Sequence, residues 1–399
     1  MKLPPVSICP FCKGKHELPI PKHCKVFLQR GTDRKLNQKF SKDFSGPSTS
    51  VFVGRYGYPN VNIGPSGVLD HELAGSIDNP SEWITMDYTN VIEMRSFLLR
   101  SKTSQGIYSK ERVVQDSQLL SMASKPTEVE MNFRKKPNFN LSFSNVIQPM
   151  GPTAELEKLS LTENPKIARK VDYIVSDELK ASDQAGNLYE EGLDIYKITS
   201  ILSSGTLGLK QKLVPTRWSI TATDDIVAKN LLPEVRCFKS LDTFKVFEAE
   251  HFDNHFVIVL APGKWEFENF EAWAPGSNWE AYTDSLVIEE YEPHEGRTKY
   301  AEKQAGGYYA ARLPAVEYLH SIRKQARVLS FREISEGYSV PLGVWVVRET
   351  VRQAFKKKPL EFSTMEEVLK YAESRLKVPM QVYKKKSALL QQRRLVDFS

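Results

Sequence analysis

Two adjacent carboxylates and an arginine stand out in residues 212–225, which read KLVPTRWSITATDD. Apolar side chains at positions 218, 220 and 222 alternate with hydroxyl side chains, and this period is typical of a short β-strand. Such a strand delivers Asp224 and Asp225 to its end, where folds often place binding chemistry. The alternative is an edge strand followed by a helix whose N-terminus Asp224 or Asp225 caps.

Two more carboxylates, Glu266 and Glu268, are spaced by two and therefore share one face of a predicted strand. Together with Asp224 and Asp225 they would form a cluster able to hold divalent metal ions, with Arg217 binding a phosphate. That arrangement predicts a metal-dependent nuclease.

A second pattern favours phosphate or base binding. Val51 and Val53 indicate a strand that glycines break into a loop bearing Arg55, Tyr56 and Tyr58. Glycine lets a backbone approach a ligand, and arginine beside tyrosine can bind phosphate and stack on bases. The same residues are also ordinary turn chemistry.

Gly306 and Gly307 open a predicted helix, and their free backbone N–H groups would face an anion, joined by Arg297 and Arg312. With Arg55, these groups would grip a pyrophosphate in an enzyme that uses a nucleotide cofactor, such as a transferase that uses NAD.

The first cysteines predict a structural zinc ion. Cys9 and Cys12 form a C-x2-C pair, and Cys24 follows. The fourth ligand is His16 or His23, and we favour His16 because His23 adjoins Cys24. A redox C-x-x-C is the alternative, but no thioredoxin-like strand precedes it.

Charge is distributed unevenly along the chain. Residues 1–45 hold ten Lys and Arg against three Asp and Glu, and residues 352–399 hold twelve against five, while the whole chain carries +6. Basic ends suit a polyanion such as nucleic acid, although they also suit solubilising termini. No apolar run approaches the ~20 residues of a membrane span and no signal peptide is recognisable, so we expect a soluble, cytoplasmic protein associated with the nucleoid.

The periodicities predict an α+β fold, with a central, largely antiparallel sheet, flanking helices, an N-terminal zinc knuckle and a flexible C-terminal tail. Helices are predicted at 90–100 and 171–204, from 306, and from a capping box at 363–366 to 376. Strands are predicted at 255–260, 264–267 and 285–291 as an antiparallel meander, with further strands at 328–331 and 343–347. Residues 103–170 are predicted to hold loops and a strand pair. The expected division is a basic zinc-binding segment (1–45), an α+β region (46–205), a β-rich domain (206–350) and a basic helix with the tail (351–399).

The C-terminal residues resemble the motif that binds the sliding clamp PCNA, in which Gln, an aliphatic residue and two aromatics plug a pocket. Gln392, Leu395 and Phe398 fit this pattern, whereas Ser399 replaces the second aromatic residue.

Four segments, FVGRYGYPNVNIGP, KLVPTRWSITATDD, GGYYAARL and PLGVWVVRE, occur in this order and resemble the archaeal Nre DNA repair family. The resemblance spans nearly the whole chain. It implies DNA damage repair in association with PCNA, a zinc knuckle at Cys9, Cys12 and Cys24, and clamp binding through Gln392, Leu395 and Phe398. It names no reaction.

Three hypotheses follow, in order of preference. The first is a DNA repair factor that the clamp recruits and whose basic ends contact DNA. The second is an enzyme acting on DNA or on a nucleotide cofactor, either the nuclease or the NAD-using transferase. The third is a non-catalytic adaptor that brings two partners together.

Overall fold

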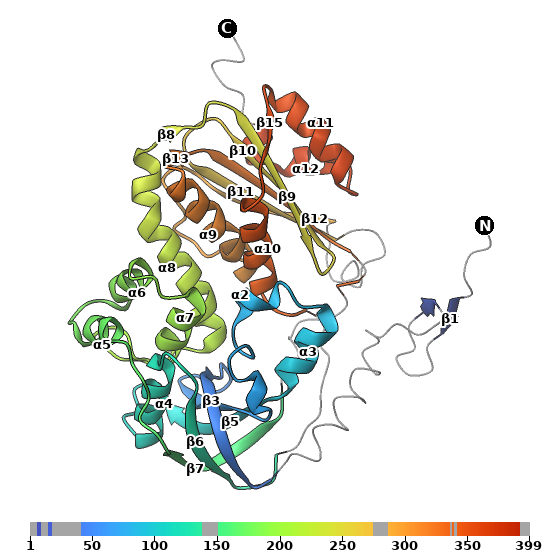
Figure 1. The fold of residues 1–399 in the computed structure, drawn as a ribbon. Helices are drawn as coiled ribbons and strands as arrows, with labels where there is room; N and C mark the ends of the chain where they lie inside the picture. Colours follow the sequence, from blue (N-terminus) through green and yellow to red (C-terminus); the bar gives the residue numbers. More distant parts are fainter. Residues whose placement is uncertain are drawn as a thin grey trace. The chain divides into compact units, whose positions relative to one another are not determined.

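A computed structural model describes residues 6–8, 15–17, 41–137, 151–273, 286–335, 337–338 and 341–391. The chain divides into two compact units. The first is formed by Met1–Thr223 with Val340–Leu342, and the second by Asp224–Ser339 with Gly343–Ser399. The boundary falls inside helix α8 (Thr216–Cys237), and the fold combines helices with several sheets (Figure 1).

The first unit is built on a closed β-barrel in the order β3-β4-β5-β7-β6. All neighbouring strands are antiparallel except β5 and β7, which are parallel. Helix α4 lies between β5 and β6 in the chain and packs Val114 and Leu120 into the barrel core. This connectivity is that of the OB fold, a five-stranded Greek-key barrel. The elements are β3 (Asp43–Val53), β4 (Asn60–Val68), β5 (Leu98–Gly106), α4 (Arg112–Met122), β6 (Thr127–Phe133) and β7 (Thr153–Leu161).

Further helices belong to the first unit. The helices predicted at 171–204 are confirmed, as α5 (Arg169–Ser176), α6 (Ala181–Glu190) and α7 (Ile195–Ser203). The segment between β4 and β5 holds η1 (His71–Leu73), α2 (Pro80–Trp83) and α3 (Tyr88–Ser96). The helix predicted at 90–100 therefore ends earlier, because its last residues enter β5. The region 103–170 contains the predicted strand pair, β6 and β7, and also the unpredicted helix α4.

The second unit contains a six-stranded sheet in the order β12-β11-β14-β10-β9-β15 among the described residues. The predicted meander is wrong in one respect: β14 inserts between β10 and β11 and pairs with β11 in parallel. The other pairs are antiparallel, so the sheet is largely antiparallel as expected. The strands are β9 (Phe244–His251), β10 (Asn254–Ala261), β11 (Glu266–Trp273), β12 (Val287–Glu292), β14 (Arg327–Ile334) and β15 (Leu360–Phe362). A small separate sheet pairs β8 (Lys239–Ser240) with β13 (Lys324–Gln325).

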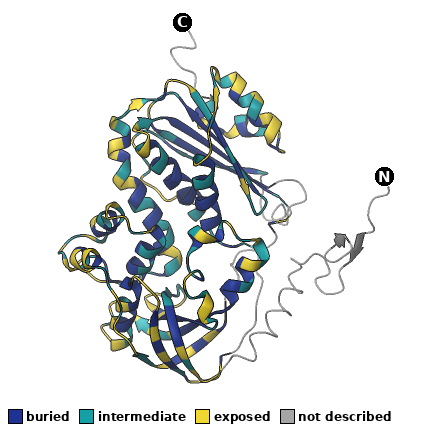
Figure 2. Cartoon of the chain, in the orientation of Figure 1, coloured by how far each residue is buried: buried dark blue, intermediate teal, exposed yellow. Residues whose placement is uncertain are grey.

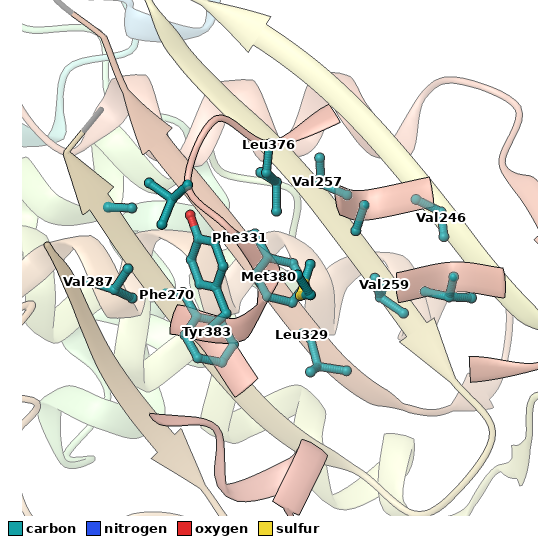
Figure 3. Packing of buried hydrophobic residues seen from close by; sticks show 14 of the residues in the cluster. Val246, Val257, Val259, Phe270, Val287, Leu329, Phe331, Leu376, Met380 and Tyr383 are labelled. Atoms are coloured by element: carbon teal, nitrogen blue, oxygen red, sulfur yellow. The ribbon is translucent and has the colours of Figure 1, made fainter. Parts of the chain in front are cut away.

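Helices cover both faces of this sheet. Helices α9 (Gly306–Ser321) and α10 (Trp345–Phe355) pack on one face, and α11 (Met365–Arg375) and α12 (Met380–Lys386) pack on the other. On the second face the rings of Phe270 and Phe331 stack at 4.9 Å, and Tyr383 of α12 meets both edge-on (Figure 3). Strands β10 and β14 are buried along nearly their whole length (Figure 2), as expected for a strand covered on both faces.

The strand predicted for residues 212–225 is wrong, because this segment enters helix α8. Ser219 and Thr223 are fully buried, and the Thr223 hydroxyl donates to the Ser219 carbonyl one turn earlier. The buried positions continue at Val227 and Ala228 with the helical period. The alternation of apolar residues at 218, 220 and 222 does not set the local structure, since Trp218 is exposed while Ser219 and Thr223 face inward.

Two other boundaries differ from the predictions. The strand predicted at 343–347 is wrong, because Trp345 begins helix α10. The capping box lies one residue later than predicted: the Thr364 hydroxyl accepts from the Glu367 N–H, and the Glu367 carboxylate accepts from the Thr364 N–H. Among the described helices none is both long and apolar enough for a bilayer span.

The N-terminal strands β1 (Val6–Ile8) and β2 (Lys15–Glu17) pair in the antiparallel sense. The predicted zinc ligands Cys9, Cys12 and Cys24 and the alternative His23 lie outside the described residues, and no side chain of β2, which contains His16, is described. The clamp motif residues Gln392, Leu395 and Phe398 also lie outside them.

Candidate functional site

Asp225 takes part in a buried ion-pair network in the second unit. Arg312 of α9, only 1 % exposed, donates from Nη2 to Asp225 Oδ1 at 2.5 Å and from Nη1 to Glu292 Oε2 at 2.6 Å. Lys229, one helical turn after Asp225, donates to the other carboxylate oxygen at 2.7 Å. Burial alone lowers the pKa of Arg312, but the charges of Glu292, Tyr308 and Asp225 outweigh it and raise the pKa above its ordinary value.

Glu292 is the fully buried centre of this network. Its Oε2 also accepts from the Tyr308 hydroxyl at 2.9 Å, and its Oε1 accepts from the Trp265 indole N–H at 3.3 Å. Burial and the Glu292 charge raise the pKa of Tyr308 well above its ordinary value. Arg297 lies over the Tyr308 ring at 4.9 Å and pairs with Glu290 at 2.7 Å. The predicted anion ligands Arg297 and Arg312 are therefore both bound to internal carboxylates.

Asp224 has a separate partner. Its two carboxylate oxygens accept from Nε and Nη2 of Arg348 at 2.8 and 2.6 Å, and both side chains are at most 2 % exposed. Burial raises the pKa of Asp224, although the positive charge and hydrogen bonds of Arg348 oppose the shift. A bidentate pair of this kind fixes α10 against α8 within the second unit.

Glu266 and Glu268 lie on the other side of the sheet from Arg312. Residues 267, 269 and 271 of β11 face α9, so the even-numbered carboxylates face α12 and its continuation. Glu266 accepts from the Tyr291 hydroxyl, and Glu268 accepts from Ser387 Oγ and the Ala388 N–H, both at 2.5 Å. The predicted carboxylate cluster is therefore not formed, and no group of three or more potential metal ligands occurs in the part of the chain that the structure describes.

Gly306 and Gly307 do open helix α9, as predicted. The carboxylate of Glu271 lies where a side chain on Gly307 would begin: a Cβ built there would meet Glu271 Oε1 at 2.5 Å. Glu271 is in turn paired with Arg332 at 2.7 Å. An internal carboxylate thus lies at this helix N-terminus, where an anion was predicted.

The loop with Arg55, Tyr56 and Tyr58 connects β3 to β4 at one end of the barrel in the first unit. Tyr56 is 70 % exposed and Tyr58 39 % exposed. Two residues distant in sequence join them: the Trp218 ring, 45 % exposed, lies 5.2 Å from the Tyr58 ring, and Lys212 Nζ lies 5.2 Å from the same ring. We call Arg55, Tyr56, Tyr58, Lys212 and Trp218 the aromatic surface.

Hydrogen bonds to the barrel hold the second half of this surface in place. The Leu213 N–H donates to the Ile107 carbonyl, and the Thr216 hydroxyl accepts from the Val53 N–H at 2.9 Å. These bonds anchor the first turn of α8 beside the loop, with Arg217 and Trp218 exposed on it. A hydrogen bond with the Tyr58 hydroxyl raises the pKa of Lys212. Sequence reasoning missed Lys212 and Trp218 as partners of the loop, because only the tertiary fold brings them to it.

Comparison with known proteins identifies the family. Residues 14–280 match the N-terminal domain of archaeal Nre, and residues 292–398 match its C-terminal domain. The chain is 37 % identical to the DNA repair protein NreB of Archaeoglobus fulgidus, over 90 % of this chain and 92 % of the relative. It is 36 % identical to the DNA repair protein NreA of the same organism, over 92 % and 93 %, and 34 % identical to NreA of Haloferax volcanii, over 87 % and 86 %.

These matches cover nearly the whole length of both partners, so the chain belongs to the archaeal Nre family. No solved structure matches it.

Replacing Arg312 tests whether the buried network is structural. Arg312→Met leaves Glu292 buried without its cation, so we expect the free energy of unfolding in urea to fall by about 3–5 kcal/mol. Lys229→Met is the matched control, because it removes the exposed partner of Asp225, and such a pair contributes about 0–1 kcal/mol. Equal small losses in both variants would contradict a stabilising role for the network.

We expect the stability of the second unit to depend on pH through Glu268. Burial raises the pKa of this carboxyl to about 7 against its hydrogen bonds from Ser387 and Ala388, so the protonated form stabilises the fold. This contribution is complete below about pH 4.5 and is lost as the pH rises through 7. Relative to Glu268→Gln, we expect the wild-type free energy of unfolding to fall by up to about 3 kcal/mol between pH 4.5 and 8. If urea titrations give parallel pH profiles for the two proteins, Glu268 does not contribute to the pH dependence of stability.

Proposed function

We propose that this chain is a DNA repair factor that contacts DNA and is recruited to the sliding clamp. Three relatives that align over most of their length are named DNA repair proteins. The observation that carries a direct DNA contact is the aromatic surface, where exposed rings and cations lie side by side. Such a factor works in the cytoplasm on the nucleoid.

The aromatic surface has the composition of a single-strand binding site. Exposed tyrosine and tryptophan rings stack on unpaired bases, and every base offers a π-face, so binding tolerates any sequence. Arg55 lies 5.0 Å over the Tyr56 ring, and Lys212 lies over Tyr58. Each of the two tyrosine rings thus has a cation close enough to reach the phosphate that follows a stacked base.

The position of this surface on the barrel supports the same proposal. In OB folds, oligonucleotides bind across the second and third strands and the loop between the first and second strands. The aromatic surface includes the corresponding loop here. Beside it one end of the outer face of β4 and β5 is exposed, where Asn62 pairs with Ser104 in register and both residues are exposed.

The basic termini contribute a contact that is independent of sequence. Lys384, Lys385 and Lys386 form the last turn of α12, and more cations follow in the tail. At the other end we propose that Cys9, Cys12 and Cys24, with His16 or His23, hold a structural zinc ion that orders the basic N-terminal segment. Phosphate contacts by these segments weaken steeply with salt.

The enzymatic alternatives receive less support. The carboxylates that a metal-dependent nuclease would need are engaged separately, Asp224 with Arg348 and Glu268 with Ser387. The arginines that would grip a pyrophosphate in an NAD-using transferase, Arg297 and Arg312, pair with glutamates. A pure adaptor leaves the exposed aromatic surface without a role.

DNA binding is tested with a labelled single-stranded oligonucleotide and fluorescence anisotropy at fixed salt. Tyr58→Ala and Trp218→Ala each remove a stacking platform, so we expect each to weaken binding by about 1–3 kcal/mol. Tyr173→Ala is the control, because Tyr173 is 69 % exposed on α5 outside the aromatic surface and its removal leaves the affinity unchanged. If all three variants bind the oligonucleotide with the wild-type affinity, the aromatic surface is not the DNA-binding interface.

Clamp binding is tested by calorimetry with an archaeal sliding clamp. Leu395→Ala and Phe398→Ala remove the apolar plug, and we expect binding to be lost, while Asp397→Ala, between them, retains it. Ser399→Phe restores a second aromatic residue and should tighten binding by about tenfold to a hundredfold, given about 1.5–3 kcal/mol for burying a phenylalanine. If all four variants bind the clamp with the wild-type affinity, the C-terminal motif does not bind the clamp.

A further inference from the structure

A second polar site lies on the covered part of the barrel's outer face in the first unit. Ser50 of β3, Ser66 of β4 and Arg100 of β5 stand opposite one another on three adjacent strands. Directly opposed residues share one face of a sheet. They alternate with the core residues Val51 and Leu99, so this row faces outward, yet Ser66 is 1 % and Arg100 6 % exposed.

Positive charge dominates this site. Arg95 of α3, 9 % exposed, and the partly buried Lys197 of α7 accompany Arg100, and Asp78 is the carboxylate that interacts with all three. No ion pair within 4.0 Å joins Asp78 to any of these cations among the described residues. Three cations therefore share one more distant carboxylate.

Several polar atoms here lack a hydrogen-bond partner in the part of the chain that the structure describes. They are Arg95 Nε, Arg100 Nη1 and Ser66 Oγ. Neighbouring rings hold the guanidinium groups without offering an acceptor: Trp83 lies 4.8 Å from Arg95 and Phe52 lies 4.9 Å from Arg100.

The electrostatics among these cations are unfavourable. Burial lowers the pKa of Arg100 to about 10, and the charge of Arg95 adds to the effect. Burial also lowers the pKa of Lys197 to about 8, against the attraction of Asp78. Folded proteins seldom bury a charge unless it is paired. A dianion placed among these cations would supply the missing charge and the missing acceptors.

We propose that this site binds the phosphate group of a small molecule, such as a nucleotide or a dinucleotide. Two guanidinium groups, an ammonium group and serine hydroxyls are the donors that phosphate oxygens take, and arginine binds them in a fork. A strand of DNA does not fit, because both guanidinium groups are more than nine-tenths buried. The ligand is thus separate from the DNA strand proposed for the aromatic surface.

Thermal unfolding of the full chain tests this site, with sodium pyrophosphate, ATP or NAD added at the ionic strength of a sodium chloride reference. A ligand that binds the folded chain raises Tm by mass action. We expect at least one probe to raise Tm and Arg100→Met to lose that shift. Lys102→Met keeps it, because Lys102 is an exposed cation two residues further along β5.

Ser66→Ala is the second test variant, which is used if Arg100→Met does not fold. It removes a buried hydroxyl to which no described residue bonds, so Tm without ligand stays unchanged, while Kd for the active probe rises roughly tenfold. ³¹P NMR of the supernatant after denaturation detects any phosphate ligand that remained bound through purification.

The proposal is overturned if no probe raises Tm beyond chloride and no phosphorus is released. It is equally overturned if Arg100→Met and Ser66→Ala respond to the probes as the wild type does, or if a 5′-phosphorylated oligonucleotide, tested alongside the three probes, is the only compound that raises Tm. Both variants keep the single-stranded DNA affinity of the wild type, so failure here leaves the proposed DNA contact standing.

Discussion

The cost of burying a charge without a partner governs how each unit of this chain is built. The second unit meets this constraint with pairs: Arg312 bonds to Glu292 and Asp225, and Arg348 bonds to Asp224 through both carboxylate oxygens. These bonds tie helices α8, α9 and α10 to one another and to strand β12. The charged residues that resemble catalytic groups in the sequence therefore fix the positions of the helices on the sheet.

The first unit uses charge differently. Its barrel core is apolar, while Arg95 and Arg100 lie buried on the outer face with polar atoms that no described residue bonds. Fold stability alone does not account for such a placement, since apolar residues of similar volume stabilise a buried position at least as well. The second unit therefore contains a structural ion-pair network, whereas the first contains the site for which we propose an external anion.

The sequence predicts elements well where local pattern and tertiary environment agree. The apolar run at 255–260 is strand β10, and the apolar spacing across 171–204 yields three helices. The prediction fails for residues 212–225, where apolar residues alternate by chance. The buried positions Ser219 and Thr223 follow the helical period but carry hydroxyl groups, and the Thr223 hydroxyl bonds to the preceding turn, so an apolar pattern does not reveal the helix. The barrel was not predicted, because closure depends on pairing between distant strands such as β3 and β6.

The same distinction applies to the sites. Arg55, Tyr56 and Tyr58 are recognisable in sequence, because glycines and exposed aromatics mark a loop, whereas Lys212 and Trp218 join them only through the fold. Arg95, Arg100 and Lys197 carry no motif, since each reads as an ordinary helix or strand cation. These three residues differ from those of the loop in their burial. Exposed rings and cations suit a long polymer such as DNA, while enclosed guanidinium groups suit a compact anion that the fold surrounds.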